Sequence, residues 1–498
     1  MVFSTIIFLL RFLPITLALY YLAPPKLKNT VLFLCSLVFY CWGEVRFFPV
    51  MLALILINYL CGLGLERFEQ NKTARLILLL IALAGSLGML FYFKYANFVL
   101  SSINAIFGTG FAPIQGISVL PLGISFYTFQ TLSYSIDVYR RDVKAERNIV
   151  DFGAYVVMFP QLIAGPIVKY RDVSDQLHVY KHRYNLKQIE EGMTLFTFGL
   201  AKKVLLADNL GVLVNNGWSS LSELTALTAW CVILGYTLQL YFDFSGYCDL
   251  AAGCARLLGL RLPINFDSPY RSLSVAEFWK RWHMTLTAFL RENVYFPLGG
   301  SRKGRGRTYL NILVVYLVSG IWHGAGWTFI LWGLLHGLAQ VLERLWGKRR
   351  DALPRWVRWA MTFLFINLAW VFFRAPDVSS ALLLLKTAVT GGMGGIRLWL
   401  VNGLFRREIS ALELLLPVIV GTTLLVNIVV YAVVSRIVPI QSILDLIRIH
   451  TSGRVYAFHK PVGSQIMVSI LLMVFWLSAA LLPIFSFIRK KASKGDIL

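Results

Sequence analysis

Long apolar runs alternate along the chain with short basic or glycine-containing segments. A helix that crosses a bilayer needs about 20 mostly apolar residues, and about a dozen stretches approach or exceed that length. The expected spans are residues 2–22, 30–60 as two helices, 74–93, 119–139, 150–168, 191–210, 224–260 as two helices, 308–344 as two helices around a glycine-rich break, 357–373, 411–433 and 465–488. The pattern therefore predicts an all-α polytopic membrane protein.

No internal repeat or low-complexity linker separates these runs. We expect residues 1–380 to form one transmembrane core and residues 381–498 to form a variable membrane region that completes the same domain. Within the second region, segments 391–395 and 436–464 are predicted to be loops.

The composition agrees with a membrane protein. Of the 498 residues, 57% are apolar and 15% are charged, and the mean hydropathy is +0.66. Soluble domains contain about 45–50% apolar and about 25% charged residues. The chain therefore has too few polar residues to cover several water-facing domains, and its aromatic content of 14% excludes a disordered protein.

The formal net charge of +23 comes from Lys and Arg residues that lie mainly between the apolar runs. Cytoplasmic loops of membrane proteins carry such an excess, whereas nucleic-acid-binding proteins gather basic residues on one exposed face. We therefore expect membrane lipids, and no nucleic acid, as partners. The basic segments are 67–75, 140–147, 169–187, 271–307, 344–358 and 489–494, of which 271–307 is the largest.

The six cysteines lie in or beside apolar stretches and show neither a Cys-x-x-Cys pair nor the Cys/His spacing of a metal site. They are expected to be free buried thiols, and no metal is expected. The apolar N-terminal stretch lacks a basic leading region and carries Arg11 in its middle. It is therefore predicted to be a retained first span rather than a cleaved signal.

A short helix with a recognisable start is predicted within the basic segment 271–307. Ser274 and Glu277 have the spacing of a capping box. In this motif the serine hydroxyl accepts from the backbone N–H of the glutamate, and the glutamate side chain accepts from the backbone N–H of the serine. A continuous helix over 274–290 would place Trp279, His283 and two leucines on one face. It is too charged to cross the bilayer, so we expect an interfacial or re-entrant helix that carries His283 into the protein.

Polar residues inside apolar stretches are the candidates for function, because an ionisable group in a span is costly. Asp243 and Asp249 are two such residues. They either pair with buried arginines or cap broken helices, or they line a proton or substrate path.

The segment Gly320–Trp327 places His323 between two tryptophans, with glycines on both sides, at the junction of two apolar helices. The glycines allow another backbone or a ligand to come close. His323 is either a structural residue or a base, since a neutral imidazole can accept a proton near pH 7. His336, thirteen residues later, is expected to be structural.

Several sequence blocks, in this order, resemble the membrane-bound O-acyltransferase family, and within it the bacterial branch that acts on polysaccharides such as alginate. The blocks are FYCWGE at 39–44, PLGISFYTFQTLSYSIDVYR at 121–140, FPQLIAGP at 159–166, YFDFSGY at 241–247, NFDSPY at 265–270, EFWKRWHMTL at 277–286, YFPLGG at 295–300 and SGIWHGAGW at 319–327. The resemblance covers roughly residues 30–375 closely, and it departs from the usual Asp-Tyr at Glu292 and Asn293.

The resemblance implies helices around a central tunnel and transfer of an acetyl group from cytoplasmic acetyl-CoA for O-acetylation of an extracytoplasmic polysaccharide. It makes His323 the catalytic base and His283 the second catalytic residue. Positioning or oxyanion support is expected from His283 or from the indole N–H of Trp322. The phosphates of acetyl-CoA are expected to bind cations of the basic segment, namely Arg302, Lys303, Arg305 and Arg307.

The resemblance also implies a multi-pass protein of the bacterial inner membrane that works in a polysaccharide synthesis complex. Its partner is expected to be an extracytoplasmic acetyltransferase or acceptor protein with a serine nucleophile. Alternatives within the family are D-alanyl transfer to teichoic acid and lipid acylation. From other classes, a proton-coupled transporter and a structural scaffold of a synthase also remain open, although the absence of a repeat argues against the transporter.

Overall fold

The computed structural model describes residues 2–117, 119–178 and 186–392. These residues form helices joined by loops, with no strand among them. The expected spans 411–433 and 465–488 and the predicted loop 436–464 lie outside the described residues.

The helices follow one another closely along the chain. The α-helices are α1 (Leu13–Leu22), α2 (Lys28–Gly43), α3 (Phe48–Arg67), α4 (Lys72–Lys94), α5 (Ala96–Phe107), α6 (Ile124–Arg140), α7 (Ile149–Val157), α8 (Phe159–Leu162), α9 (Tyr170–His178), α10 (Leu186–Ala201), α11 (Asp208–Ser219), α12 (Ala226–Leu257), α13 (Val275–Arg281), α14 (Met284–Leu290), α15 (Arg305–His323), α16 (Trp327–Trp346), α17 (Lys348–Asp351), α18 (Arg355–Arg374) and α19 (Val378–Thr390). The π-helical segments are η1 (Phe8–Phe12), η3 (Lys202–Ala207) and η6 (Arg291–Tyr295), and the 3-10 segments are η2 (Pro25–Leu27), η4 (Leu221–Glu223) and η5 (Pro269–Arg271).

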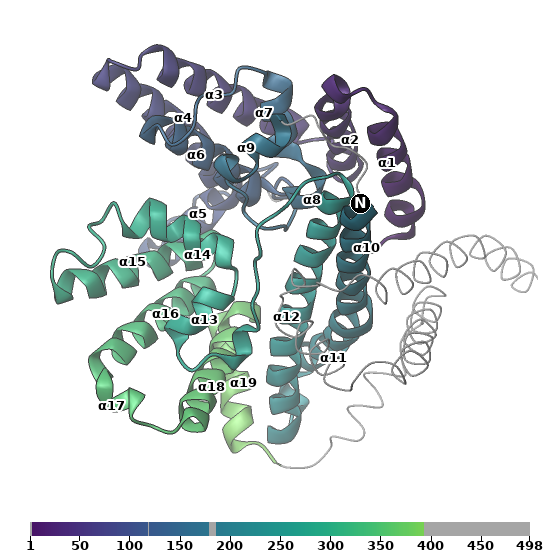
Figure 1. Ribbon diagram of the computed structural model, residues 1–498. Helices are drawn as coiled ribbons and strands as arrows, with labels where there is room; N and C mark the ends of the chain where they lie inside the picture. Colours follow the sequence, from purple (N-terminus) through teal and green to yellow (C-terminus); the bar gives the residue numbers. More distant parts are fainter. Residues whose placement is uncertain (1, 118, 179–185, 393–498) are drawn as a thin grey trace, which may run out of the picture.

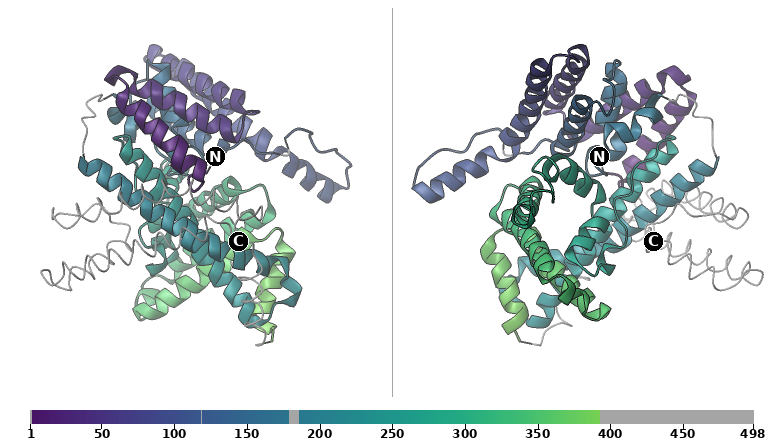
Figure 2. Two further views of the ribbon diagram at one scale, coloured as in Figure 1. Left: turned by 90° about the vertical axis from the view of Figure 1, so that its right-hand side faces the viewer. Right: turned by 60° about the vertical axis from the view of Figure 1, so that its left-hand side comes forward.

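Two groups of helices, one in the upper part and one at the lower left of Figure 1, both contact the long helix α12. The first group runs from α1 to α9, and the second from α13 to α19. Helices α10 and α11 pack along α12. Helix α5 extends away from the body, as both views in Figure 2 show, and it exposes Ile106 and Phe107 near its end.

Several predicted spans are confirmed as helices. Segment 30–60 forms two helices, α2 and α3, and segment 308–344 forms α15 and α16 around a break at 324–326. Among the described residues, α3, α4 and α18 are long and apolar enough to cross a membrane by length and composition. The expected dozen spans are therefore not reached in this part of the chain.

Segment 224–260 forms one helix, α12, and the prediction of two helices there is wrong. Its 32 residues begin at a capping box in which the Thr225 side chain accepts from the backbone of Thr228. At 1.5 Å per residue α12 is about 48 Å long, which exceeds the bilayer core of about 30 Å. It must therefore tilt strongly or project from the membrane.

The glycines of α12 serve close packing rather than a break. A Cβ added at Gly253 would lie 2.7 Å from the carbonyl oxygen of Gly192, and one added at Gly199 would lie 2.6 Å from that of Gly246. The backbones of α10 and α12 thus approach through two glycine pairs, as small residues allow at helix contacts in membranes.

Replacing Gly253 by alanine is expected to lower the free energy of unfolding by about 1–3 kcal/mol, because the new methyl group forces α10 and α12 apart. Thermal unfolding in detergent measures the change. The control is Gly88→Ala in α4, where no atom lies within 4 Å of the added Cβ, so stability is expected to be unchanged or raised by up to about 1 kcal/mol. Equal melting temperatures for the two variants would contradict this view of the contact.

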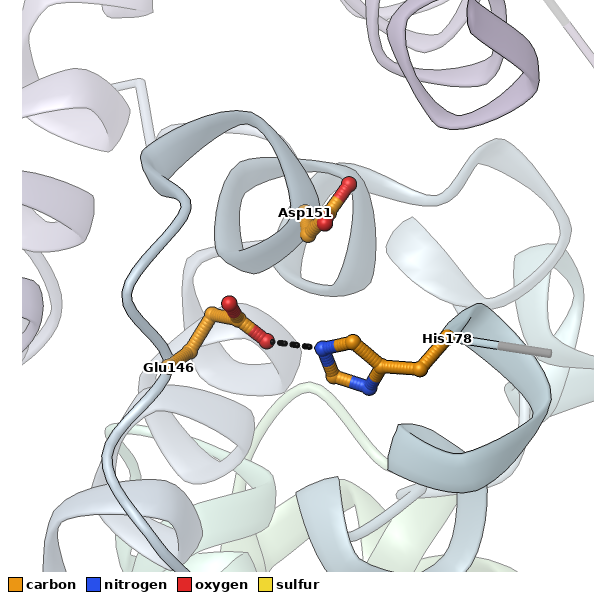
Figure 3. Close-up of side chains that lie close together, drawn as sticks. All are labelled: Glu146, Asp151 and His178. Carbon is orange, nitrogen blue, oxygen red and sulfur yellow. Dashed lines mark ion pairs between the residues drawn. The ribbon is translucent and has the colours of Figure 1, made fainter. Parts of the chain in front are cut away.

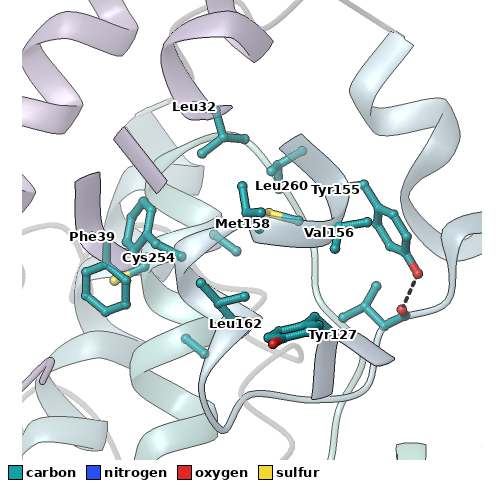
Figure 4. Packing of buried hydrophobic residues seen from close by; sticks show 14 of the residues in the cluster. Leu32, Phe39, Tyr127, Tyr155, Val156, Met158, Leu162, Cys254 and Leu260 are labelled. Atoms are coloured by element: carbon teal, nitrogen blue, oxygen red, sulfur yellow. Dashed lines mark hydrogen bonds between the residues drawn. The ribbon is translucent and has the colours of Figure 1, made fainter. Parts of the chain in front are cut away.

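Segment 150–168 is not a single span, contrary to prediction. Helix α7 ends at Val157 and α8 begins at Phe159, because Pro160 cannot continue the hydrogen-bond ladder of α7. The backbone N–H of Phe159 instead donates to Ser36 Oγ at 3.1 Å. The break lies in the largest apolar core, where Met158 and Leu162 meet side chains of α2, α6 and α12 (Figure 4).

Candidate functional site

A cavity of about 330 Å³ lies where one end each of α4, α6, α15 and α18 meet the segment between α13 and α14. Its lining is largely aromatic and apolar and contains two histidines and one lysine, but no carboxylate among the described residues. The lining residues are Lys94, Leu120, Pro121, Gly123, Ile124, Ser125, Phe126, Ile163, Leu240, Phe244, Trp282, His283, Trp322, His323, Trp370 and Phe373.

His323 reaches this cavity as the last residue of α15. Its ring lies 4.8 Å from the ring of Trp322 and 5.1 Å from those of Trp332 and Phe373, measured between centroids. The residue is partly exposed, and neither ring nitrogen has a hydrogen-bond partner among the described residues. Both nitrogens therefore remain available to a ligand.

Gly320, three residues before His323, acts as the sequence suggested by allowing another backbone to come close, and Gly333 of α16 does the same from the other helix. A Cβ on Gly320 would lie 2.3 Å from the carbonyl oxygen of Phe329, and one on Gly333 would lie 2.3 Å from that of Tyr316. Helices α15 and α16 therefore pack backbone against backbone, which fixes the end of α15 that carries His323.

His283 lines the same cavity, but the expected continuous helix over 274–290 is wrong. The helix breaks after Arg281, and His283 has the left-handed backbone conformation with φ 44° and ψ 54°. Of the two hydrogen bonds of the capping box predicted at the start of the first half, only one is formed. Ser274 Oγ accepts from the N–H of Glu277 at 2.9 Å, but the Glu277 carboxylate accepts from the N–H of Leu273 rather than Ser274.

Asn265 holds His283 in this break. Its Oδ1 lies 3.1 Å from His283 Nδ1 and accepts hydrogen bonds from the N–H and the hydroxyl of Thr285. Its backbone oxygen also accepts from the N–H of Met284 at 3.0 Å. Sequence reasoning quoted Asn265 only as part of a motif and assigned it no role.

Trp322 stands between the two histidines. Its ring lies 6.1 Å from the His283 ring and stacks on Phe129 at 5.2 Å. Its indole Nε1 is buried and has no hydrogen-bond partner. The structure thus brings together His283, Trp322 and His323, the three residues that the resemblance made candidates, in the lining of one cavity, with an unpaired N–H donor beside the imidazoles.

Lys94, which sequence reasoning missed, also lines the cavity. Its Nζ donates to the carbonyl oxygen of Trp322 and, at 3.1 Å, to Ser125 Oγ. No acidic side chain pairs with it among the described residues. The signal in the sequence was a lysine placed directly after the apolar run 74–93.

The predicted phosphate-binding cations lie elsewhere. Arg302, Lys303, Arg305 and Arg307 are exposed, in the loop before α15 and in its first turn. His323 is at the opposite end of α15, about 27 Å away along the helix axis. None of the four cations lines the cavity.

His336 and the two aspartates lie outside the cavity lining. His336 is fully buried and accepts a hydrogen bond from Trp279 Nε1 at 3.1 Å on its Nδ1. Asp243 and Asp249 pair with Lys203 and Lys202 at 2.7 and 2.6 Å. The partners are lysines of η3 rather than the expected arginines.

Glu292, whose role the sequence left in doubt, forms an ion-pair network between η6 and α9. Its carboxylate lies 2.7 Å from Lys169 Nζ and 2.6 Å from Arg171 Nη2. Burial would raise the pKa of Glu292, but the hydrogen bond and charge of Lys169 and the charge of Arg171 outweigh it and hold the pKa below its ordinary value.

Replacing Glu292 by glutamine is expected to lower the free energy of unfolding by about 2 kcal/mol at pH 7, less than the about 3–5 kcal/mol for a fully buried pair. The carboxylate stabilises the fold fully above the ordinary glutamate pKa of about 4.3, and this is lost as pH falls through the lower folded value. The difference in melting temperature between wild type and variant should therefore shrink in acid. Glu69→Gln, which breaks an exposed pair with Arg141, should change stability little.

A third polar cluster contains Glu146, Asp151 and His178 (Figure 3), whose potential ligand atoms lie within 4.8 Å of one another. Its carboxylate oxygens already accept hydrogen bonds or ion pairs. Glu146 accepts from His178 Nε2 at 2.8 Å and from the Asn148 N–H at 2.9 Å, and Asp151 accepts from the Asn29 amide at 2.9 Å. The cluster therefore connects the segment before α7 with α9 and α2.

Comparison with known proteins places these residues in a family context. The sequence model of the membrane-bound O-acyltransferase family matches residues 143–376, a range that includes His283, Trp322 and His323. The chain is 41% identical over 420 residues to a probable alginate O-acetylase of Azotobacter vinelandii, which covers 83% of this chain and 82% of that protein.

Two further relatives differ in the substrates that their names give. A peptidoglycan O-acetyltransferase of Helicobacter pylori is 38% identical over 432 residues, or 80% of this chain and 81% of that protein. A teichoic acid D-alanyltransferase of Streptococcus thermophilus is 29% identical over 246 residues, or 47% of this chain and 59% of that protein.

Proposed function

The chain belongs to the membrane-bound O-acyltransferase family of membrane proteins, and from this premise we propose that it moves an acetyl group from cytoplasmic acetyl-CoA for O-acetylation of an extracytoplasmic polysaccharide. The observation that carries the proposal is the shared cavity of His283 and His323, with the indole of Trp322 between them. The relatives named above as an alginate O-acetylase and a peptidoglycan O-acetyltransferase support the acyl group and the class of acceptor.

The residues of the cavity suit acyl transfer from a thioester. His323 takes the proton from the acceptor hydroxyl as its oxygen bonds to the acetyl carbonyl carbon. The Trp322 indole N–H donates to the oxyanion that develops on the carbonyl oxygen. When the oxyanion collapses, the carbon–sulfur bond breaks, and CoA leaves as a thiolate that can take up the proton held by His323.

The charges at the helix ends support an extracytoplasmic position for the cavity. Helices α4, α6 and α15 each place one end at the cavity, and their opposite ends carry Lys72, Arg140 and Arg305. Basic ends favour the cytoplasm by the positive-inside rule. The acceptor then enters from outside, in a multi-pass protein of the bacterial inner membrane.

The basic segment before α15 is proposed to bind the CoA phosphates on the cytoplasmic side. Replacing Arg302, Lys303, Arg305 and Arg307 together by glutamine is expected to raise KM for acetyl-CoA by about 10-fold or more, because each charged contact contributes about 1.5–3 kcal/mol. The control replaces the exposed Lys348 and Arg349 by glutamine. If neither set of replacements changes KM, the four charges do not bind acetyl-CoA and only set the orientation of the chain in the membrane.

The proposal is tested with purified chain in liposomes and radiolabelled acetyl-CoA, by following CoA release and the label. A partner protein with a serine nucleophile, within a polysaccharide synthesis complex, is proposed to receive the acetyl group outside. Adding this partner should raise transfer to polymer. Full transfer by the chain alone would contradict the need for it.

D-alanyl transfer is the second candidate, supported by the similarity to the teichoic acid D-alanyltransferase over about half of this chain. The two functions differ in the acyl donor. Release of CoA from acetyl-CoA favours acetyl transfer, whereas consumption of a D-alanyl carrier protein with no reaction of acetyl-CoA favours the alternative.

A further inference from the structure

The hydrogen bonds around Asn265 fix which of its side-chain atoms is the acceptor. The backbone N–H of Thr285 can only donate, and it points to Asn265 Oδ1 at 3.1 Å. The Thr285 hydroxyl lies 2.9 Å from the same atom. The other side-chain atom, Nδ2, donates to Cys248 Sγ at 3.3 Å. Asn265, which is only 3% exposed, therefore presents a carbonyl oxygen to His283.

This orientation also fixes the tautomer of His283. Because Asn265 Oδ1 is an acceptor, His283 Nδ1 at 3.1 Å must carry the hydrogen. A neutral imidazole has one N–H, so Nε2 carries a lone pair. Nε2 is buried and has no hydrogen-bond partner, while His283 lines the cavity and its ring meets that of Phe244 edge to face at 4.8 Å.

The backbone around His283 shows that the position is imposed by its neighbours. A left-handed conformation costs a residue other than glycine about 1–3 kcal/mol and persists only where the surroundings hold it. Here the oxygens of Asn265 accept from the backbone N–H groups of Met284 and Thr285. One asparagine thus sets both the direction and the protonation of the imidazole.

We propose that Asn265 is a positioning residue that holds His283 as a hydrogen-bond acceptor for a hydroxyl of the acyl acceptor, beside the base His323. This inference rests on the proposed function. In this tautomer His283 has no N–H directed away from Asn265, so oxyanion support falls to Trp322. The group that these imidazole acceptors suit is an alcohol hydroxyl, as carried by the serine of the proposed partner or by a sugar.

The first test reads the tautomer without any activity. The chain is prepared with ¹⁵N-labelled histidine in lipid nanodiscs, and the resonances of His283 are assigned by their loss in His283→Gln. The expected spectrum shows Nε2 in the unprotonated range in wild type, and a shift toward the Nε2–H form in Asn265→Ala. An Nε2–H signal in wild type would overturn the inference, even if the proposed function holds.

The second test measures acetyl transfer. Asn265→Ala is expected to lower kcat for CoA release with alginate oligosaccharides as added acceptor by about 10-fold or more. Its effect on the hydrolysis of acetyl-CoA, measured without the added acceptor, should be much smaller. Equal losses in both reactions would indicate damage to the fold and overturn the role. Cys248→Ala, which removes only the partner of Nδ2, is the matched control and should stay within about 3-fold of wild type.

A chemical rescue separates tautomer control from packing. Nδ-methylhistidine at position 283 cannot carry a hydrogen on Nδ1, so its neutral form always has a lone pair on Nε2. The methyl group fits only where the Asn265 side chain has been removed. In the Asn265→Ala background this replacement should restore most of the lost kcat, and no restoration would contradict the role of Asn265. Absence of CoA release in wild type would refute the proposed function, while the spectrum would still decide the tautomer.

Discussion

Replacing His323 by alanine is expected to reduce acetyl transfer by about 10²–10⁴-fold, the usual contribution of a general base. His323 lies at the end of α15 on the cavity, and no hydrogen bond to the described residues occupies its ring. Its loss therefore removes the proton acceptor without breaking a structural bond. The measurement is the initial rate of CoA release from acetyl-CoA by reconstituted protein, with elution from a sizing column as the check on folding.

The matched control is His336→Gln. His336 is buried outside the cavity lining and accepts a hydrogen bond from Trp279, and the glutamine oxygen can accept the same bond. This variant should keep activity within a few-fold of wild type. Near-normal transfer by the His323 variant, or equal losses in both variants, would remove His323 from the role of base.

Replacing Trp322 by phenylalanine is expected to lower kcat by about 10²–10³-fold, the loss seen when one oxyanion donor is removed. Phenylalanine keeps an aromatic ring against Phe129 but has no N–H. Because the donor acts on charge that develops in the transition state, KM for acetyl-CoA should change little. Steady-state kinetics of CoA release give both constants.

Trp218→Phe controls for the loss of a buried indole N–H. Trp218 also has an unpaired buried Nε1, but it lies in α11 and does not line the cavity. Its replacement should leave kcat within about 3-fold of wild type. If Trp322→Phe instead raises KM at constant kcat, the indole binds the ground state and the oxyanion has another donor.

A lysine in the cavity lining supports the end of α15. Lys94 is its one cation among the described residues, and it donates to the carbonyl oxygen of Trp322 at the end of α15. Lysine at a helix C-terminus interacts favourably with the exposed carbonyl groups. Lys94 therefore holds the turn that carries both Trp322 and His323.

Local sequence patterns predicted the helices best where apolar runs had clear ends. The prediction of two helices over 308–344 was correct because glycines mark the break between them. The break at Pro160 and the continuity of α12 were not predicted. In α12, Gly246 and Gly253 do not interrupt the helix but pack against Gly199 and Gly192 of α10. A glycine that breaks a helix and one that admits a neighbour look alike until the neighbour is known.

The sequence by itself determined an all-helical membrane chain, its family resemblance, and His283, Trp322 and His323 as candidate site residues, because composition, periodicity and motif order are local properties of the chain. Only the tertiary structure decided that these three residues share one cavity, that the cations before α15 lie at the far end of that helix, and that Asn265 fixes the proton on His283. The physical reason is that hydrogen bonds and cavity walls join residues from separate helices. No local pattern specifies such a distance or a donor's direction.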